Sequence, residues 1–158
     1  MIGSMTYKNR QQGFSLIEVL VAAVIIAIGL LGLAGLQTRS LQMNQSAHYR
    51  SQANFYAYEI VDAMRMNREA ARNGDFAFDM GDTAPSGDSM SEEALERWIE
   101  GIRTTLPMSG DNTGGSITVN DSPDGTEVIV TVAWFDERWV EDGTNEEKIR
   151  EVTLETEL

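Results

Sequence analysis

The chain contains no cysteine and a single histidine, His48, among its 158 residues. Without cysteine there is neither a disulfide nor a Cys/His pair, so zinc clusters and cysteine nucleophiles are excluded. The sequence places no nucleophile beside His48, which argues against a catalytic triad. Any domain in this chain must therefore be held together by packing alone.

Positively charged residues are also few. The chain has 12 lysines and arginines against 25 aspartates and glutamates, a formal net charge of −13. Residues 14–73 are nearly balanced, whereas residues 74–158 carry five basic and twenty-one acidic side chains. Such a segment repels phosphate backbones, so we expect no nucleic-acid partner. Solubility of an exported domain is the simplest explanation of the acidity, and a basic partner surface is the alternative.

A long apolar run lies near the N-terminus. It begins at Phe14 as FSLIEVLVAAVIIAIGLLGLAGL, and every residue from Val19 to Leu36 is apolar or glycine. Eighteen such residues are enough to cross a membrane as a helix. Lys8 and Arg10 precede the run and place the N-terminus on the cytoplasmic side. We therefore expect a single-pass membrane helix over residues 14–36.

One carboxylate interrupts this run. Glu18 would cost about 2.5–3.5 kcal/mol at the middle of a bilayer, and less near the boundary, so it needs a partner. An ordinary signal peptide has a shorter apolar core without an acid. A signal peptide cut after Ala34, in Gly32-Leu33-Ala34, is therefore the less favoured interpretation.

The order of residues around Glu18 has a more specific match. The segment GFSLIE, from Gly13 to Glu18, resembles the prepilin motif of type IV pilins and of the pseudopilins of type II secretion. The resemblance implies that a prepilin peptidase removes residues 1–13 by cutting after Gly13 and then methylates Phe14. It also implies that Glu18 meets the N-terminal ammonium of a neighbouring subunit. Such a pair about 4 Å apart is attracted by about 4 kcal/mol at an effective dielectric constant of 20, which helps to offset its desolvation.

Within this family, the chain most resembles the pilus-modification minor pilins called PilV, in size and in the continuation IAIGLLGLAGLQTRSLQ. Many major pilins have a C-terminal disulfide, and proline where this chain has Gly35. The leading hypothesis is a minor pilin, a structural subunit and no enzyme, which acts in pilus assembly and initiation or at the tip, in twitching motility and adhesion. We expect no cofactor and no metal.

The resemblance also implies partners and a location. The expected partners are the prepilin peptidase, other minor pilins and the major pilin, which would pack through the N-terminal helix. The protein would lie in the bacterial inner membrane before assembly and in the pilus at the cell surface afterwards. Three alternatives stay open: a minor pseudopilin of type II secretion, a tip adhesin or binding module and, with least support, an anchored enzyme.

Three glycines, Gly29, Gly32 and Gly35, recur at a spacing of three inside the apolar run. Glycine costs about 1 kcal/mol relative to alanine in a helix. The three residues either allow neighbouring helices to pack closely, or loosen the helix inside a fibre as the family's proline does. Ordinary membrane-helix composition explains them equally well.

Residues 37–158 are predicted to form one domain, and the second half of a helix from Phe14 to Arg72 is its spine. This half contains no proline and should end at Asn73-Gly74, a favourable C-terminal cap. Its apolar residues recur at helical spacing and are Ala53, Ala57, Ile60, Val61 and Met64.

A loop, a second helix and a sheet are predicted after the spine. The acidic loop 75–90 matches the variable loop of pilins, and its alternating apolar residues (Phe76, Phe78 and Met80) should tuck against the sheet edge. A helix over residues 91–106 begins with a capping box, Ser89 and Glu92, and stops before Pro107. Its apolar face comprises Leu95, Trp98, Ile99, Ile102 and Leu106.

Strands are predicted at residues 116–119, 127–135 and 151–158, the first two joined by a turn-forming loop. Three or four antiparallel strands on a long helix give the α+β pilin fold. The aspartate-rich segments 111–114 and 121–125 do not have the spacing of a calcium loop, so they are interpreted as turns.

Overall fold

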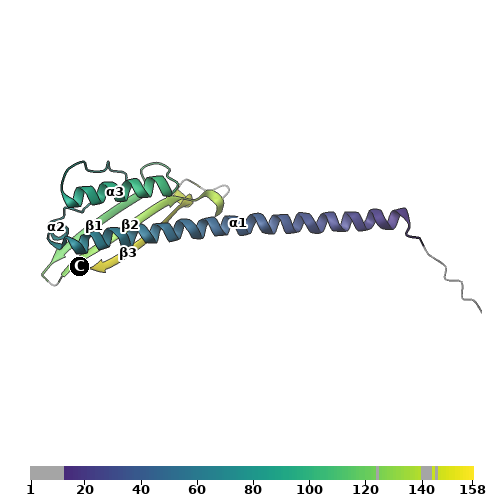
Figure 1. The fold of residues 1–158 in the computed structure, drawn as a ribbon, viewed down its shortest axis with the longest axis horizontal. Helices are drawn as coiled ribbons and strands as arrows, with labels where there is room; N and C mark the ends of the chain where they lie inside the picture. The colour runs from purple at the N-terminus through teal and green to yellow at the C-terminus, as the bar shows by residue number, and fades with distance from the viewer. Residues whose placement is uncertain (1–12, 124, 140–143, 145) are drawn as a thin grey trace, which may run out of the picture. The chain divides into compact units, whose positions relative to one another are not determined.

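The computed structural model of the protein describes residues 13–123, 125–139, 144 and 146–158 (Figure 1). The predicted leader, apart from Gly13, lies outside the described residues. The chain forms two compact units, of which the first ends at Leu41 and the second runs from Gln42 to Leu158. Helix α1, Leu16–Met66, contributes its apolar run to the first unit and the spine to the second.

Helix α1 departs from the prediction at both ends. It begins at Leu16, where the backbone N–H groups of Glu18 and Val19 donate to the carbonyl of Ser15. The prediction of one helix reaching Arg72 is wrong, because Asn67 leaves the helical conformation at φ −129° and ψ 60°. The amide side chain of asparagine competes with the helix for backbone partners, which makes such a break inexpensive.

A short helix, α2 (Arg68–Arg72), follows this break. It ends where the sequence indicates. Asn73 caps its C-terminus, and Gly74 adopts a left-handed φ of 82°, which favours glycine. The predicted end of the helical spine at Asn73-Gly74 is therefore right, but the spine is two helices rather than one.

The second predicted helix is α3, Met90–Thr105, which begins one residue earlier than expected. Its capping box is present: the Ser89 hydroxyl accepts from the Glu92 backbone N–H at 3.2 Å, and the Glu92 carboxylate accepts from the Ser89 N–H at 3.2 Å. Leu106, which precedes Pro107, is extended, because proline disfavours the helical conformation of the residue before it.

Three antiparallel strands form one sheet in the order β1-β2-β3. They are β1 (Gly114–Ser122), β2 (Gly125–Phe135) and β3 (Ile149–Glu157), each longer than predicted. Pairing of β1 with β2 continues to Ser122 and Gly125, so the connecting loop is shorter than expected. Two short 3-10 helices, η1 (Glu137–Trp139) and η2 (Glu146–Lys148), lie between β2 and β3.

The core of the second unit lies between the sheet and the helices α1 and α3 (Figure 1). Both predicted apolar helix faces are buried there in full, together with the inward side chains of the central strand β2. Trp98 ties α3 to α1, because its indole N–H donates to the Tyr56 carbonyl at 2.8 Å. The α+β pilin-like arrangement predicted from the sequence is thus confirmed.

The loop between α2 and α3 also behaves as predicted. Phe76 and Phe78 are buried, and Met80 is half-buried. The backbone of Phe78 exchanges two hydrogen bonds with Ile117 of β1, at 3.0 and 2.8 Å. The loop therefore pairs with the free edge of β1 at Ile117, which blocks that point of the edge from pairing with another chain.

One close contact in the core leads to a prediction. A Cβ atom on Gly115 of β1 would overlap the six-membered ring of Trp98, which is fully buried. We expect Gly115→Ala to lower the free energy of unfolding by about 1–3 kcal/mol, because a packed core cannot absorb the added carbon. Chemical unfolding followed by circular dichroism measures the loss.

The control for this prediction is Thr118→Ala, a change on the exposed face of the same strand. It should cost less than about 1 kcal/mol. Equal stabilities of Gly115→Ala and the unaltered protein would contradict the packing described for Trp98.

Candidate functional site

The predicted processing and assembly residues lie at the start of α1. Gly13 precedes the helix, and Phe14 is 83% exposed. Glu18 is exposed in the first turn, where its negative charge suits the positive end of the helix dipole. None of the ion pairs found among the described residues involves Glu18.

The apolar run of α1 is uncovered along its whole length. Every residue from 13 to 45 is exposed, including large apolar side chains such as Leu31 at 74%. In the part of the chain that the structure describes, α1 is the one helix long and apolar enough to cross a membrane. A core helix of a soluble protein would bury most of such a segment. This surface needs lipid or other protein chains around it.

Gly29, Gly32 and Gly35 lie within this exposed helical segment. A Cβ atom on any of them would meet nothing within 4 Å. No contact within the described chain therefore requires glycine at these positions. The three glycines do not break the helix, which continues past them to Met66.

A second cluster, absent from the sequence predictions, surrounds Asp136 at the end of β2. Its carboxylate is 2% exposed and accepts hydrogen bonds from the Ser46 hydroxyl at 2.8 Å and from Arg138 Nε at 2.6 Å. Arg138 in turn donates from Nη1 to Gln45 Oε1 at 2.8 Å, and its guanidinium lies 4.9 Å from the centre of the Tyr49 ring. These contacts, which we call the Asp136 cluster, fasten the β2–β3 connection to α1.

The charges of this cluster are mutually stabilised. Burial acts to raise the pKa of Asp136, but hydrogen bonds from Arg138 and Ser46, together with the charge of Arg138, outweigh it and hold the pKa below the ordinary 3.8. The hydrogen bond to Asp136 raises the pKa of Arg138. Both groups therefore stay charged at neutral pH.

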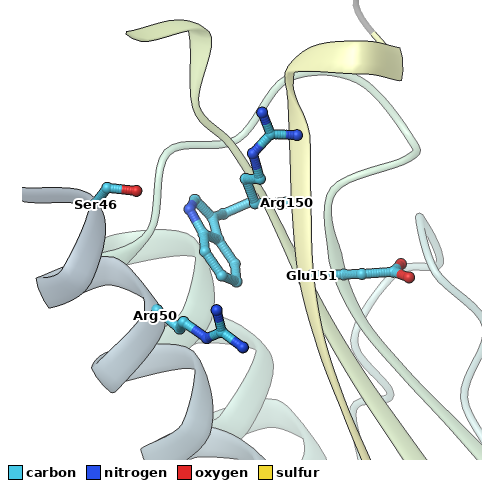
Figure 2. Close-up of a pocket in the computed structure, with 5 residues that line it drawn as sticks. Ser46, Arg50, Arg150 and Glu151 are labelled. Atoms are coloured by element: carbon cyan, nitrogen blue, oxygen red, sulfur yellow. The ribbon is translucent and has the colours of Figure 1, made fainter. Parts of the chain in front are cut away.

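A cavity of about 370 Å³ lies beside this cluster, between α1 and the start of β3. Figure 2 shows Ser46 and Arg50 on the helix and Arg150 and Glu151 on the strand. Trp134 completes the lining. Its indole Nε1 is buried and has no hydrogen-bond acceptor among the described residues, which costs about 1–3 kcal/mol.

The described residues contain no group of three histidines, aspartates or glutamates that could hold a metal ion. The aspartate-rich segments form turns: Thr126 donates to the Asp121 carboxylate at 2.6 Å, and Thr113 bonds to the backbone of Ser109 and Gly110. Asp124 lies outside the described residues. His48 is exposed beside Tyr49.

Comparison with known proteins gives one match. Residues 8–34 match the family described as "Prokaryotic N-terminal methylation motif". No curated protein and no solved structure matches the chain. The motif supports a type IV pilin-like or pseudopilin-like prepilin and points to a structural subunit rather than an enzyme. With the exposed apolar helix, it fits a pilin anchored in the inner membrane.

The Asp136 cluster predicts a pH dependence. Because the folded-state pKa of Asp136 lies below its unfolded value, its contribution to stability is present above pH 3.8 and is lost as the pH falls through the lower folded-state pKa. Asp136→Asn should lower the free energy of unfolding at neutral pH by about 1–3 kcal/mol. It should also flatten the acid limb of the stability curve, measured by chemical unfolding from pH 2.5 to 7.

Asp88→Asn provides the control, because Asp88 is an exposed loop residue. Its pH profile should follow that of the unaltered protein. An acid limb of the same steepness in Asp136→Asn would contradict the proposed charge stabilisation.

Proposed function

We propose that the protein is a minor pilin of a type IV pilus. Its leader is cut after Gly13, Phe14 becomes the methylated N-terminus, and Glu18 acts in assembly. One observation carries this proposal: a prepilin-type motif at residues 8–34 coincides with the first part of α1, in which every residue up to 45 is exposed. A subunit that passes from the membrane into a fibre of parallel helices requires both the processing motif and the exposed apolar helix.

The chemistry of the N-terminus supports this assignment. Cleavage would create an ammonium group on Phe14, and methylation of an amine retains its charge. In an apolar surrounding, neither this ammonium nor the Glu18 carboxylate is well solvated alone. Glu18 lies on the first turn of α1, close along the chain to the new N-terminus. The amine of an incoming subunit pairs with the Glu18 carboxylate of its neighbour, which fixes the axial step between subunits.

The assignment to the minor pilins, and to the PilV type among them, rests on the remainder of the sequence. The chain has no cysteine, and Gly35 stands where many major pilins have proline. Its domain is small, with three strands on one helical spine and a second helix. Roles in pilus initiation, motility and adhesion follow from this assignment.

A minor pseudopilin of type II secretion is the second candidate, because the matched motif supports pilins and pseudopilins alike. A deletion strain separates the two functions. Loss of twitching motility with intact protein secretion supports the pilus, and the opposite result supports the secretion system.

Processing provides the first prediction. N-terminal sequencing and intact mass of the protein from its native membrane should give a chain that begins with N-methyl-Phe14. In a strain without the prepilin peptidase, residues 1–13 should be retained. A start at Gly35 would instead indicate ordinary signal-peptide cleavage, and a retained leader in the normal strain would remove the proposal.

Assembly provides the second prediction. Glu18→Ala should reduce the amount of the subunit in sheared pili by at least about tenfold, since the lost ion pair is worth more than 1.4 kcal/mol in an apolar environment. Immunoblotting of pili, normalised to the membrane fraction, measures this. Glu59→Ala, an exposed carboxylate later on α1, is the matched control and should assemble normally. Equal incorporation of both variants would show that Glu18 has no part in assembly.

A further inference from the structure

The cavity between α1 and β3 has the composition of an anion site. Two arginines, Arg50 and Arg150, line it together with Trp134 and Ser46. Positive charge is in the minority in this part of the chain, because residues 42–158 hold nine basic against twenty-four acidic side chains. We propose that this cavity binds the carboxylate of an aspartate or glutamate on a neighbouring filament subunit. This inference rests on the proposed function for the identity of the partner.

Arg150 is held in position for such a role. Its Nη1 donates to the carbonyls of Glu147 and Ile149, each at 3.1 Å. These bonds to its own strand region orient the guanidinium, while Nε and Nη2 have no acceptor among the described residues. A guanidinium that is fixed at one nitrogen and open at the others presents the planar pair of donors that a carboxylate accepts.

Arg50 supplies the second positive charge. It is exposed on α1, and its guanidinium has no partner among the described side chains. Figure 2 shows it on the side of the cavity opposite the strand that carries Arg150. Each guanidinium contributes positive potential to the cavity, which attracts an anion.

Trp134 gives an independent indication of a missing acceptor. Its side chain is 2% exposed, and the buried indole N–H finds no acceptor in the part of the chain that is described. Buried donors of this kind are normally satisfied. Ser46 already donates to Asp136, so the indole N–H is the neutral donor at this position that lacks an acceptor among the described residues.

Glu151 is the one lining residue that opposes an anion. In Figure 2 its side chain extends from β3 on the side away from Ser46 and Arg50. It is exposed, so its charge is solvated and screened. Two arginines and an indole N–H outweigh one solvated carboxylate at this position.

Charge complementarity favours an acidic protein segment as the occupant. The domain is strongly acidic, so most of its surface repels an acidic neighbour, whereas the cavity attracts one. A subunit that shares this acidity is attracted to the domain at such a positive point and repelled by most of the remaining surface. The cavity is therefore a specific contact site between subunits.

The experiment uses the full-length protein in detergent micelles and a capped pentapeptide of alternating glycine and glutamate. Binding is followed by tryptophan fluorescence at constant ionic strength. We expect saturable binding of this peptide and none of the matched glycine–glutamine peptide. Arg50→Gln and Arg150→Gln should each raise Kd about tenfold, Arg50→Lys should raise it less, and Trp134→Phe should abolish most of the fluorescence change.

Arg68→Gln is the control, since Arg68 is an exposed arginine on α2, away from the cavity lining. It should leave Kd unchanged, and circular dichroism checks that each variant is folded. Absence of binding, equal binding of both peptides, or unchanged Kd in both cavity arginine variants would overturn the inference. Tighter binding of inorganic phosphate than of the peptide would also overturn it, in favour of a phosphate site.

The outcome is separate from that of the proposed function. Peptide binding does not depend on processing at Gly13 or on Glu18. A protein that binds the peptide but is never processed would refute the pilin proposal and leave the carboxylate site. A protein that is processed and assembled but does not bind the peptide would refute the carboxylate site and leave the pilin proposal.

Discussion

The fold and the proposed function both depend on one constraint: α1 is a single helix with two different burial requirements. From residue 46 onward its apolar face is covered by the sheet and by α3, whereas every residue from 13 to 45 is exposed. A free-standing apolar surface of this size is not stable in water, so the first half of the helix demands lipid or other helices. Placing the Glu18 carboxylate in an apolar environment costs free energy, and pairing with a positive charge would offset that cost.

The chain has no cysteine, so no disulfide stabilises the domain. Its stability comes from a core in which the two helices and β2 contribute side chains, and tryptophan occupies two key positions. Trp98 is satisfied by the Tyr56 carbonyl and packs directly on Gly115. Trp134 is equally buried and lacks such a partner among the described residues. The two indoles therefore differ in whether a described acceptor meets the N–H group.

Local signals in the sequence predicted most of the fold. Helical spacing identified the buried faces, the Ser89–Glu92 pair marked a helix start, and Asn73-Gly74 marked a helix end. The break at Asn67 escaped prediction because one asparagine is tolerated in many helices. The Asp136 cluster and the cavity could not be predicted, because Ser46 and Asp136 are 90 positions apart and only the folded chain brings them together. The sequence WFDERW at residues 134–139 was the sole hint.

The Asp136 cluster also has a mechanical consequence. Ser46 is the first half-buried residue of α1, and Gln45 and Ser46 bond directly to Arg138 and Asp136. A force applied along α1 from its N-terminal end would therefore act on these charge-assisted hydrogen bonds before it acts on the buried apolar contacts. Such bonds are short-ranged and directional, so they resist sliding of the helix more stiffly than apolar contacts do. These polar contacts therefore join α1 to the rest of the second unit ahead of the buried residues of the helix, which begin at Ala53.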